Sequence, residues 1–267
     1  MQLIPTAKTI KFDKSTDYKG NFIIEPLYPG YGITIGNTLR RVLISSIPGA
    51  AITAVKIKGV DHEFSSIDYI KEDVVDIFLN IKQVNLSIEG EINPDEPLKI
   101  TLSKKGKTKV TAKDFKCPSQ VTIANPDLHL VTLTDAASSL EMECYVETGS
   151  GYSPTESREK DKLETDFIAI DAIFTPINHV NVENEHVRVG EMTDWDKLIL
   201  SVETNGTITC QKAFDFAVNV LSDQFIALQK TPKDKPTVVK TSKPKKDKVT
   251  TVAAESEPAT TSEKEEK

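Results

Sequence analysis

Hydrophobic and polar residues alternate in several short segments between residues 51 and 175 of this 267-residue chain. In residues 84–89, 98–103 and 140–147, every second side chain is apolar and most of those between are polar or charged. Successive side chains of a strand point to opposite faces of its sheet. The pattern therefore predicts antiparallel strands with one buried face and one face in water.

One segment of this region departs from the alternation. Its apolar residues recur mostly at intervals of three or four, which is the spacing of one face of a helix. The spacing predicts a helix over residues 67–81, with Ser65 or Ser66 as its N-cap. The apolar residues concerned are Ile67, Ile70, Val74, Ile77, Phe78 and Ile81.

The residues before this region predict one strand followed by one helix. Residues 21–27 read as a strand that Pro26 ends, and a turn follows at residues 29–32. Apolar residues at helical spacing then predict a helix of 13–15 residues that stops at Pro48. Its apolar stripe consists of Ile35, Leu39, Val42 and Leu43.

The residues after residue 175 repeat that order. A hairpin is predicted around residues 183–186, followed by a strand over residues 198–202 that ends before Asn205. A helix over residues 210–228 closes the region, with Thr209 as N-cap. Its apolar residues include Phe214, Ala217, Leu221, Phe225 and Leu228.

This order of elements predicts an α+β protein in which one domain is inserted into another. Residues 1–50 and 176–230 form the first, discontinuous domain, and residues 51–175 form a β-rich inserted domain. Residues 231–267 contain no Leu, Ile, Phe, Tyr or Trp and are predicted to be a disordered, charged tail.

The charge of the chain limits what it can bind. Formal net charge is −7, of which the first 230 residues carry −9 and the tail +2, so a globally basic nucleic-acid binder is not expected. The tail is basic over residues 233–248, which fits either a weak nucleic-acid contact or a solvated linker. Three scattered cysteines indicate a reducing compartment. No apolar run is long enough for a membrane span and no secretory signal is visible, so a cytoplasmic protein is expected.

No arrangement of residues typical of a catalytic or metal site is found. The glycines at positions 30, 32 and 36 are spaced GxGxxxG, which is not the dinucleotide fingerprint. The four histidines are dispersed and none has metal-ligand spacing with a cysteine. A lowered pKa is physically possible for Cys210 at a helix start, but no partner for a catalytic role is suggested nearby. We therefore expect no catalytic residue, no metal and no bound cofactor in this chain.

Two features of the helices point to protein partners. The last helix is apolar over more than one face, which favours homodimerisation through helix pairing. The first helix carries Arg40 and Arg41 in an otherwise apolar sequence, and arginine is favoured at protein interfaces. A nucleotide-binding enzyme built on the glycines and an autonomous DNA-binding module built on the tail are the competing hypotheses.

Residues 25–49, EPLYPGYGITIGNTLRRVLISSIPG, resemble the signature helix of the bacterial RNA polymerase alpha subunit family. Further segments resemble later motifs of that family in the same order and extend the resemblance over residues 20–228. These segments are residues 62–65, 72–82, 151–154, 171–176, 193–198 and 203–207.

The resemblance implies a homodimer that nucleates assembly of the polymerase. It implies that one copy binds the beta subunit and the other the beta-prime subunit, and that omega and sigma join the larger complex. Arg41 matches the main beta-binding residue, and Lys82 matches a residue of the same docking surface. The docking residues implied are Arg40, Arg41, Gly36, Asn37, Thr38, His62, Glu63, Phe64, Ser65 and Lys82. The first and last helices would form the dimer interface through Ile35, Leu39, Val42, Leu43, Phe214, Ala217, Leu221, Phe225 and Leu228.

The resemblance also implies that the chain is a non-catalytic part of a nucleotidyltransferase, DNA-directed RNA polymerase. The magnesium ion would then belong to the large catalytic subunit, and the protein would be cytoplasmic and nucleoid-associated. Family members continue into a carboxy-terminal DNA-binding domain, which nothing in residues 231–267 matches. Direct DNA contact by this chain is therefore expected to be weak or absent.

Overall fold

The computed structural model describes residues 4–90, 97–158 and 166–229. The tail predicted to be disordered, residues 231–267, lies outside these residues. The strands and helices are β1 (Thr9–Thr16), β2 (Lys19–Leu27), α1 (Tyr31–Ser45), β3 (Pro48–Ile57), α2 (Val74–Ile81), β4 (Leu86–Ile88), β5 (Leu98–Lys105), β6 (Lys109–Thr111), β7 (Val121–Ile123), β8 (His129–Thr132), β9 (Ser139–Ser150), β10 (Tyr152–Ser153), β11 (Ile168–Ala169), β12 (Ala172–Ile173), β13 (Ile177–Val189), β14 (Met192–Thr204) and α3 (Cys210–Gln229).

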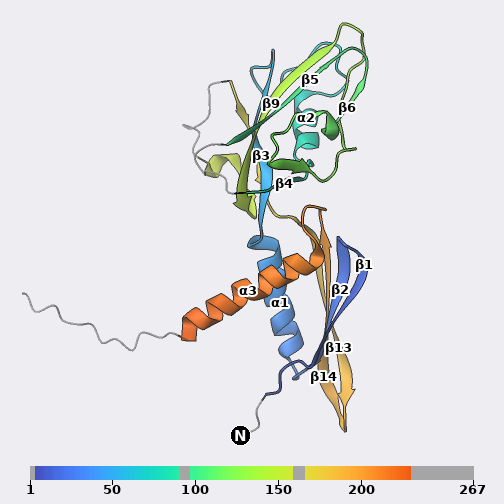
Figure 1. The fold of residues 1–267 in the computed structure, drawn as a ribbon, viewed down its shortest axis with the longest axis vertical. Coiled ribbons are helices and arrows are strands. Elements are labelled where there is room, and N and C mark those ends of the chain that lie inside the picture. The colour runs from blue at the N-terminus through green and yellow to red at the C-terminus, as the bar shows by residue number, and fades with distance from the viewer. Residues whose placement is uncertain (1–3, 91–96, 159–165, 230–267) are drawn as a thin grey trace, which may run out of the picture. The chain divides into compact units, whose positions relative to one another are not determined.

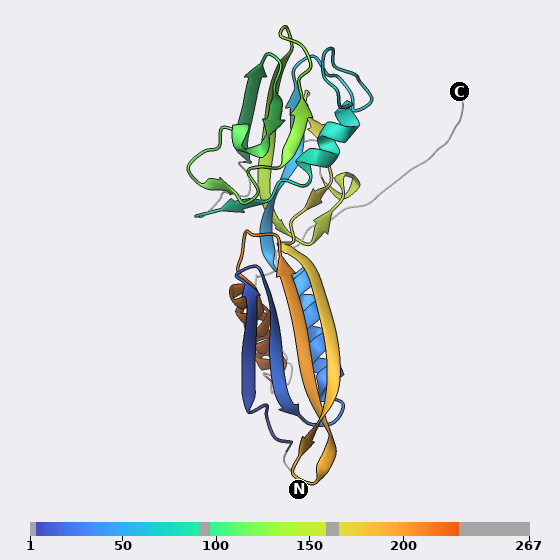
Figure 2. The same ribbon diagram turned by 90° about the vertical axis from the view of Figure 1, so that its right-hand side faces the viewer.

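One antiparallel sheet combines strands from the two ends of the chain, in the order β1-β2-β14-β13. Helices α1 and α3 cover the same face of this sheet (Figures 1 and 2). The buried apolar residues between sheet and helices form one core. The central pair, β2 and β14, buries Phe22, Ile24, Leu198 and Leu200 beneath the helices. This sheet and its core therefore form only when the first and last segments of the described chain pack together.

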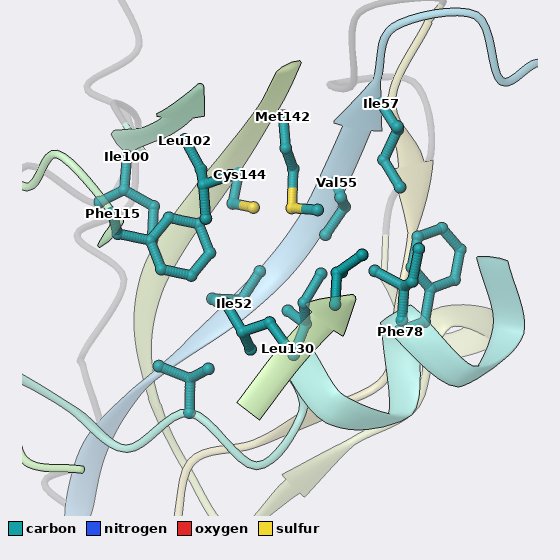
Figure 3. Close-up of a cluster of buried hydrophobic side chains, with 14 of the residues drawn as sticks. Ile52, Val55, Ile57, Phe78, Ile100, Leu102, Phe115, Leu130, Met142 and Cys144 are labelled. Carbon is teal, nitrogen blue, oxygen red and sulfur yellow. The ribbon is translucent and has the colours of Figure 1, made fainter. Parts of the chain in front are cut away.

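A second sheet, of order β5-β9-β3-β4-β7, lies between residues 48 and 150, with β11 pairing with β3. Its apolar face and helix α2 enclose a separate core, part of which Figure 3 shows. Ile52 and Val55 from β3, Ile100 from β5 and Cys144 from β9 all point into this core. The α+β fold class is confirmed, and the alternating segments are the strands that the sequence predicts.

The hairpin predicted around residues 183–186 is wrong. Residues 177–189 form one continuous strand, and the chain reverses at Gly190, whose φ is 63°. Glycine tolerates this left-handed conformation, which explains why the chain reverses there. The side chains of residues 183–186 instead point alternately to the two faces of the strand. Their polarity reflects a strand of which one side is in water, not a turn.

The predicted start of the middle helix is also wrong. Helix α2 begins at Val74 with Asp73 at its N-cap, not near Ser65. Residues before it are held in an irregular segment in which Tyr69 has a φ of 62° and Ile70 forms an isolated bridge with Leu133. The apolar side chains of Ile67 and Ile70 pack on the same core from this segment, so their spacing imitates an earlier helical turn.

Candidate functional site

Asp196 of β14 fixes the N-terminus of α1 to the sheet. This residue is only 1% exposed. Its Oδ2 accepts hydrogen bonds from the backbone N–H groups of Gly30 at 2.8 Å and Gly32 at 3.0 Å. Burial alone would raise the pKa of Asp196, but hydrogen bonds from Asn184 and from these N–H groups, with His186 nearby, lower it. A phosphate-binding role for these glycines is disfavoured, because the N–H groups of Gly30 and Gly32 already donate to a carboxylate.

The buried side of α1 consists of Gly32, Gly36, Leu39 and Leu43. A Cβ on Gly36 would lie 2.5 Å from Val182 Cγ1 and 2.8 Å from Leu198 Cδ1. This glycine therefore lets the helix approach β13 and β14 closely. Gly36, expected among the docking residues, lies on the packed side of the helix and not at the surface.

The exposed side of α1 carries the two arginines. Arg40 shares one helical stripe with Ile33, Asn37 and Ile44, all of them exposed. Arg41 lies about 100° further round, on a stripe with half-buried Thr38. Within the described part of the chain, neither guanidinium group forms a hydrogen bond or an ion pair. Both cations are therefore free to meet an external acceptor.

The remaining polar side chains of the Arg41 stripe are already engaged. Thr38 Oγ1 donates to the carbonyl oxygen of Thr34 at 2.7 Å, and Ser45 Oγ donates to that of Arg41 at 2.7 Å. Such hydroxyls bonded to the preceding helical turn have no donor left for a partner. Arg41 is accordingly the group on this stripe best able to bind an anionic or polar partner group.

A second group of the expected residues gathers beside α2. Glu63, Phe64 and Lys82 line one groove of about 300 Å³, together with Val75 and Leu79 of the helix. Phe64 is 79% exposed, and Val75 and Leu79 are exposed as well. His62 and Ser65 flank Glu63 and Phe64 in the sequence and hydrogen-bond to each other. His62 Nδ1 and Ser65 Oγ are 3.2 Å apart. The groove therefore combines an apolar floor with charged edges.

Lys82 is held in place at the edge of this groove by Asp171. Lys82 Nζ lies 3.1 Å from Asp171 Oδ2, and Asp171 Oδ1 accepts the N–H of Thr155 at 3.0 Å. The N–H of Thr155 and the ammonium group of Lys82 lower the pKa of Asp171. The ion pair restrains the Lys82 side chain and offsets part of its positive charge.

Helix α3 is divided into a packed half and an uncovered half. Its first turns bury Ala213, Phe214 and Ala217, and the Phe214 ring stacks on Phe22 with centroids 4.2 Å apart. From Val218 onward no residue of the helix is buried within the chain. This second half projects past α1 (Figure 1). Its apolar stripe consists of the exposed residues Val218, Phe225 and Leu228 and of half-buried Leu221.

The residues expected at the dimer interface therefore fall into three groups. Leu39, Leu43, Phe214 and Ala217 are buried in the core of the single chain. Ile35, Val42 and Leu221 are half-buried and pack against that core. Phe225 and Leu228 are 58% and 74% exposed, which leaves them available to a second chain.

Titratable and metal-ligating groups add no further site within residues 4–90, 97–158 and 166–229. No cluster of three or more His, Cys, Asp or Glu side chains there could hold a metal ion. Burial raises the pKa of the Cys210 thiol, the opposite of what an activated cysteine requires. No described helix is both long and apolar enough to cross a membrane.

Exposed apolar and cationic side chains on helices are typical of the class of proteins that bind other proteins. Comparison with known proteins identifies the family to which the chain belongs. Residues 55–175 match the family model described as the RNA polymerase Rpb3/RpoA insert domain. The DNA-directed RNA polymerase subunit alpha of Desulforamulus reducens is 42% identical over 248 residues, which cover 92% of this chain and 77% of the relative.

Two further relatives carry the same name. The protein of Roseiflexus castenholzii is 52% identical over 202 residues, which cover 76% of this chain and 61% of the relative. The protein of Herpetosiphon aurantiacus is 48% identical over 202 residues, which cover 76% of this chain and 59% of the relative. The matched part of the chain thus spans about three fifths of the length of these two relatives. The chain belongs to the family of DNA-directed RNA polymerase alpha subunits.

Proposed function

We propose that this chain is a homodimeric scaffold that nucleates assembly of DNA-directed RNA polymerase by binding the beta and beta-prime subunits. The observation that carries the proposal is that α1 and α3 pack on one sheet and still leave two surfaces uncovered. One is the apolar stripe of α3, and the other is the arginine face of α1. The chain itself is non-catalytic in this proposal, and the magnesium and nucleotide chemistry belong to the large subunits.

The apolar stripe of α3 supports the homodimer. Val218, Leu221, Phe225 and Leu228 recur at intervals of three and four, so they form one seam along the helix. A large apolar side chain left in water forgoes about 1.5–3 kcal/mol of burial energy. A second copy of the same helix covers the seam symmetrically, because a two-fold interface presents the same patch twice.

The arginine face of α1 supports docking of a large subunit. Arginine is enriched among the residues that dominate interface energies, and it retains several donors in a planar fork. Because Arg41 has no partner within the described residues, docking need not break an internal ion pair. Exposed Ile33 and Ile44 lie beside the arginines and supply apolar contact around them.

The groove beside α2 extends the proposed docking surface. Phe64, Val75 and Leu79 offer apolar contact, while the Lys82–Asp171 ion pair offers polar groups that the pairing already restrains. Pre-ordered side chains lose less entropy when a partner binds. In a two-fold dimer both surfaces occur twice, so one copy can receive the beta subunit and the other the beta-prime subunit.

Replacement of Arg41 by alanine tests this proposal. Loss of an interface arginine of this kind costs at least about 2 kcal/mol, so beta should bind about 30-fold more weakly. Arg188→Ala is the matched control, since Arg188 is also exposed but lies on β13. Affinity would be measured by surface capture of the beta subunit, with the dimer checked by sedimentation. Equal affinity of Arg41→Ala and the control for beta would contradict the assignment.

A further inference from the structure

The two surfaces of the proposed docking site belong to different buried cores. Arg41 lies on α1, which packs on the four-stranded sheet, whereas the groove beside α2 belongs to the core of the second sheet. In the part of the chain that the structure describes, no buried apolar residue is shared by the two cores. Parts of a chain that have separate cores move relative to each other unless further contacts hold them. A partner that binds both surfaces therefore depends on the contacts that join the cores.

The boundary between the two cores is loosely packed near the end of α2. A cavity of about 480 Å³ lies there, and residues from both sides line it. Val84 and Asn85 line it from the α2 side, and Ile177, Asn178 and Asn205 line it from the other side. Side chains that face a cavity lack packing partners on that side. Hydrogen bonds that cross the boundary here consequently provide much of the local restraint.

A side-chain hydrogen bond crosses this boundary. Asn85 Nδ2 donates to the carbonyl oxygen of Asn205 at 3.0 Å, and the two residues are 120 positions apart in the chain. The amide nitrogen of Asn85 must face this partner, because a carbonyl oxygen only accepts. Both residues are half-buried, so water competes less for the bond than it would at the open surface.

Both ends of this bond are held by neighbouring backbone. The N–H of Asn85 donates to Asn125 Oδ1 at 2.9 Å, and Asn125 Nδ2 donates to the carbonyl oxygen of Gln83 at 2.8 Å. On the other side, the N–H of Asn205 donates to the carbonyl oxygen of Pro176 at 2.9 Å. The Asn85–Asn205 bond thus joins two segments that are already ordered, and little entropy is lost when it forms.

The place of Asn85 in the chain connects this bond to the docking groove. Helix α2 ends at Ile81, Lys82 follows as its C-cap, and Asn85 is three residues further on. Asn205 lies between the end of β14 and the start of α3, the helix that carries the proposed dimer seam. The bond therefore ties the segment that leaves the groove to the segment that begins the dimer helix.

We propose that Asn85 is a positioning residue for binding of the beta subunit, because its side-chain amide keeps the groove beside α2 at a fixed distance from Arg41. The inference rests on the proposed function, in which one large subunit contacts both surfaces. Two linked surfaces present themselves to a partner at a high effective concentration, and this gain falls when their spacing is free to vary. Asn85 itself does not have to touch the partner.

The test is the affinity of the full chain for the beta subunit, measured by surface capture. Asn85→Ala removes the amide and keeps the backbone hydrogen bonds of residue 85, so beta should bind about fivefold more weakly, the effect of one lost hydrogen bond. Asn85→Asp keeps the size, lacks the donor and should lose at least as much. Asn178→Ala is the matched control and should bind normally, because Asn178 lines the same cavity but hydrogen-bonds to Thr204 within its own sheet.

A chain with a blocked groove separates positioning from a general structural defect. It carries Phe64→Ala and Leu79→Glu, both at exposed positions. Beta can then bind only through the α1 surface, so adding Asn85→Ala should cause no further loss of affinity. The same fivefold loss with the groove open and blocked would overturn the proposal, since unrelated defects add. Unchanged affinity of Asn85→Ala with the groove open would overturn it too.

Failure of the proposed function gives a different result. If the chain with the blocked groove binds beta as tightly as the unaltered chain, the groove is not a docking surface, and this inference is wrong with that part of the proposed function. If the blocked groove weakens binding and Asn85→Ala does not, only the positioning role is wrong. Circular dichroism melting and sedimentation show whether each variant folds and dimerises, and Asn85→Asp takes the place of Asn85→Ala if the alanine variant does not fold.

Discussion

Asp196 and Gly32 are 164 positions apart in the chain, and the carboxylate of the first accepts the backbone N–H of the second at 3.0 Å in a buried environment. The same oxygen accepts the N–H of Gly30, so a single atom of β14 satisfies two of the N–H groups at the start of α1. Because α1 also carries Arg40 and Arg41, this contact sets where the proposed docking surface begins.

Asp196→Ala should lower the free energy of unfolding by about 2 kcal/mol. The substitution leaves the buried N–H of Gly32 and the part-buried N–H of Gly30 without an acceptor, and it removes a negative charge from a helix N-terminus. Asp194→Ala is the control, because Asp194 lies two residues away on the same strand and is exposed. Urea denaturation of the two variants provides the comparison. An equal stability of both variants would show that the capping contact contributes little.

The contribution of Asp196 should depend on pH. Its folded-state pKa is lowered from the ordinary value of about 3.9, so the unfolded chain takes up the proton first as the pH falls. The stabilisation is therefore complete above the unfolded pKa and is lost as pH falls through the folded pKa. Asp196→Asn should show a weaker loss of stability in acid than the unaltered chain. Urea midpoints measured from neutral pH to about pH 3 would show this, and parallel curves would refute it.

The sequence reveals those features of the fold that depend on local pattern. Thr209 is the predicted N-cap of α3, and its Oγ1 accepts the N–H of Lys212 at 3.4 Å. The alternation in residues 140–147 likewise becomes part of β9, with Cys144 fully buried. In both cases the residues that decide the conformation lie within a few positions of one another.

Features that depend on distant contacts could not be predicted in this way. Nothing near Asp196 in sequence marks it as the cap of α1, because its partners lie in another segment. Helical periodicity likewise shows that Phe214 and Phe225 lie on an apolar stripe. It does not show which residues cover that stripe. The structure separates the two, since Phe214 packs on Phe22 while Phe225 remains exposed.

Gly36→Ala should destabilise the protein although alanine is the better helix former. Alanine in a helix interior is favoured over glycine by about 1 kcal/mol. The added Cβ would lie 2.5 Å from Val182 and 2.8 Å from Leu198, and overpacking of this kind costs about 1–3 kcal/mol. We expect a net loss of about 1 kcal/mol in urea denaturation. Asn37→Ala, at the neighbouring exposed position, is the control and should not lower the stability. A higher stability of Gly36→Ala would contradict the prediction and would mean that β13 and β14 can shift to accommodate the added methyl group.

The three cysteines should differ in reactivity in the folded protein. Burial raises the pKa of Cys117, Cys144 and Cys210, but Cys117 is only half-buried while the other two are buried. Alkylation requires access and the thiolate, so Cys117 should react first and the others only through unfolding. Timed alkylation followed by peptide mass spectrometry provides the order. Equal rates in denaturant serve as the control, and early modification of Cys144 would contradict the prediction.

Phe225→Glu should separate the proposed dimer into monomers. A two-fold interface contains the substitution twice, and each lost phenylalanine contact is worth about 2 kcal/mol. The dimer should therefore weaken by about 4 kcal/mol, or roughly 1000-fold in dissociation constant. Ala227→Glu adds the same charge about 200° further round the helix, away from the apolar stripe, and should leave the dimer intact. Sedimentation equilibrium over a range of concentrations measures both constants. If Phe225→Glu and Ala227→Glu dissociate equally, the stripe of Val218, Leu221, Phe225 and Leu228 is not the seam.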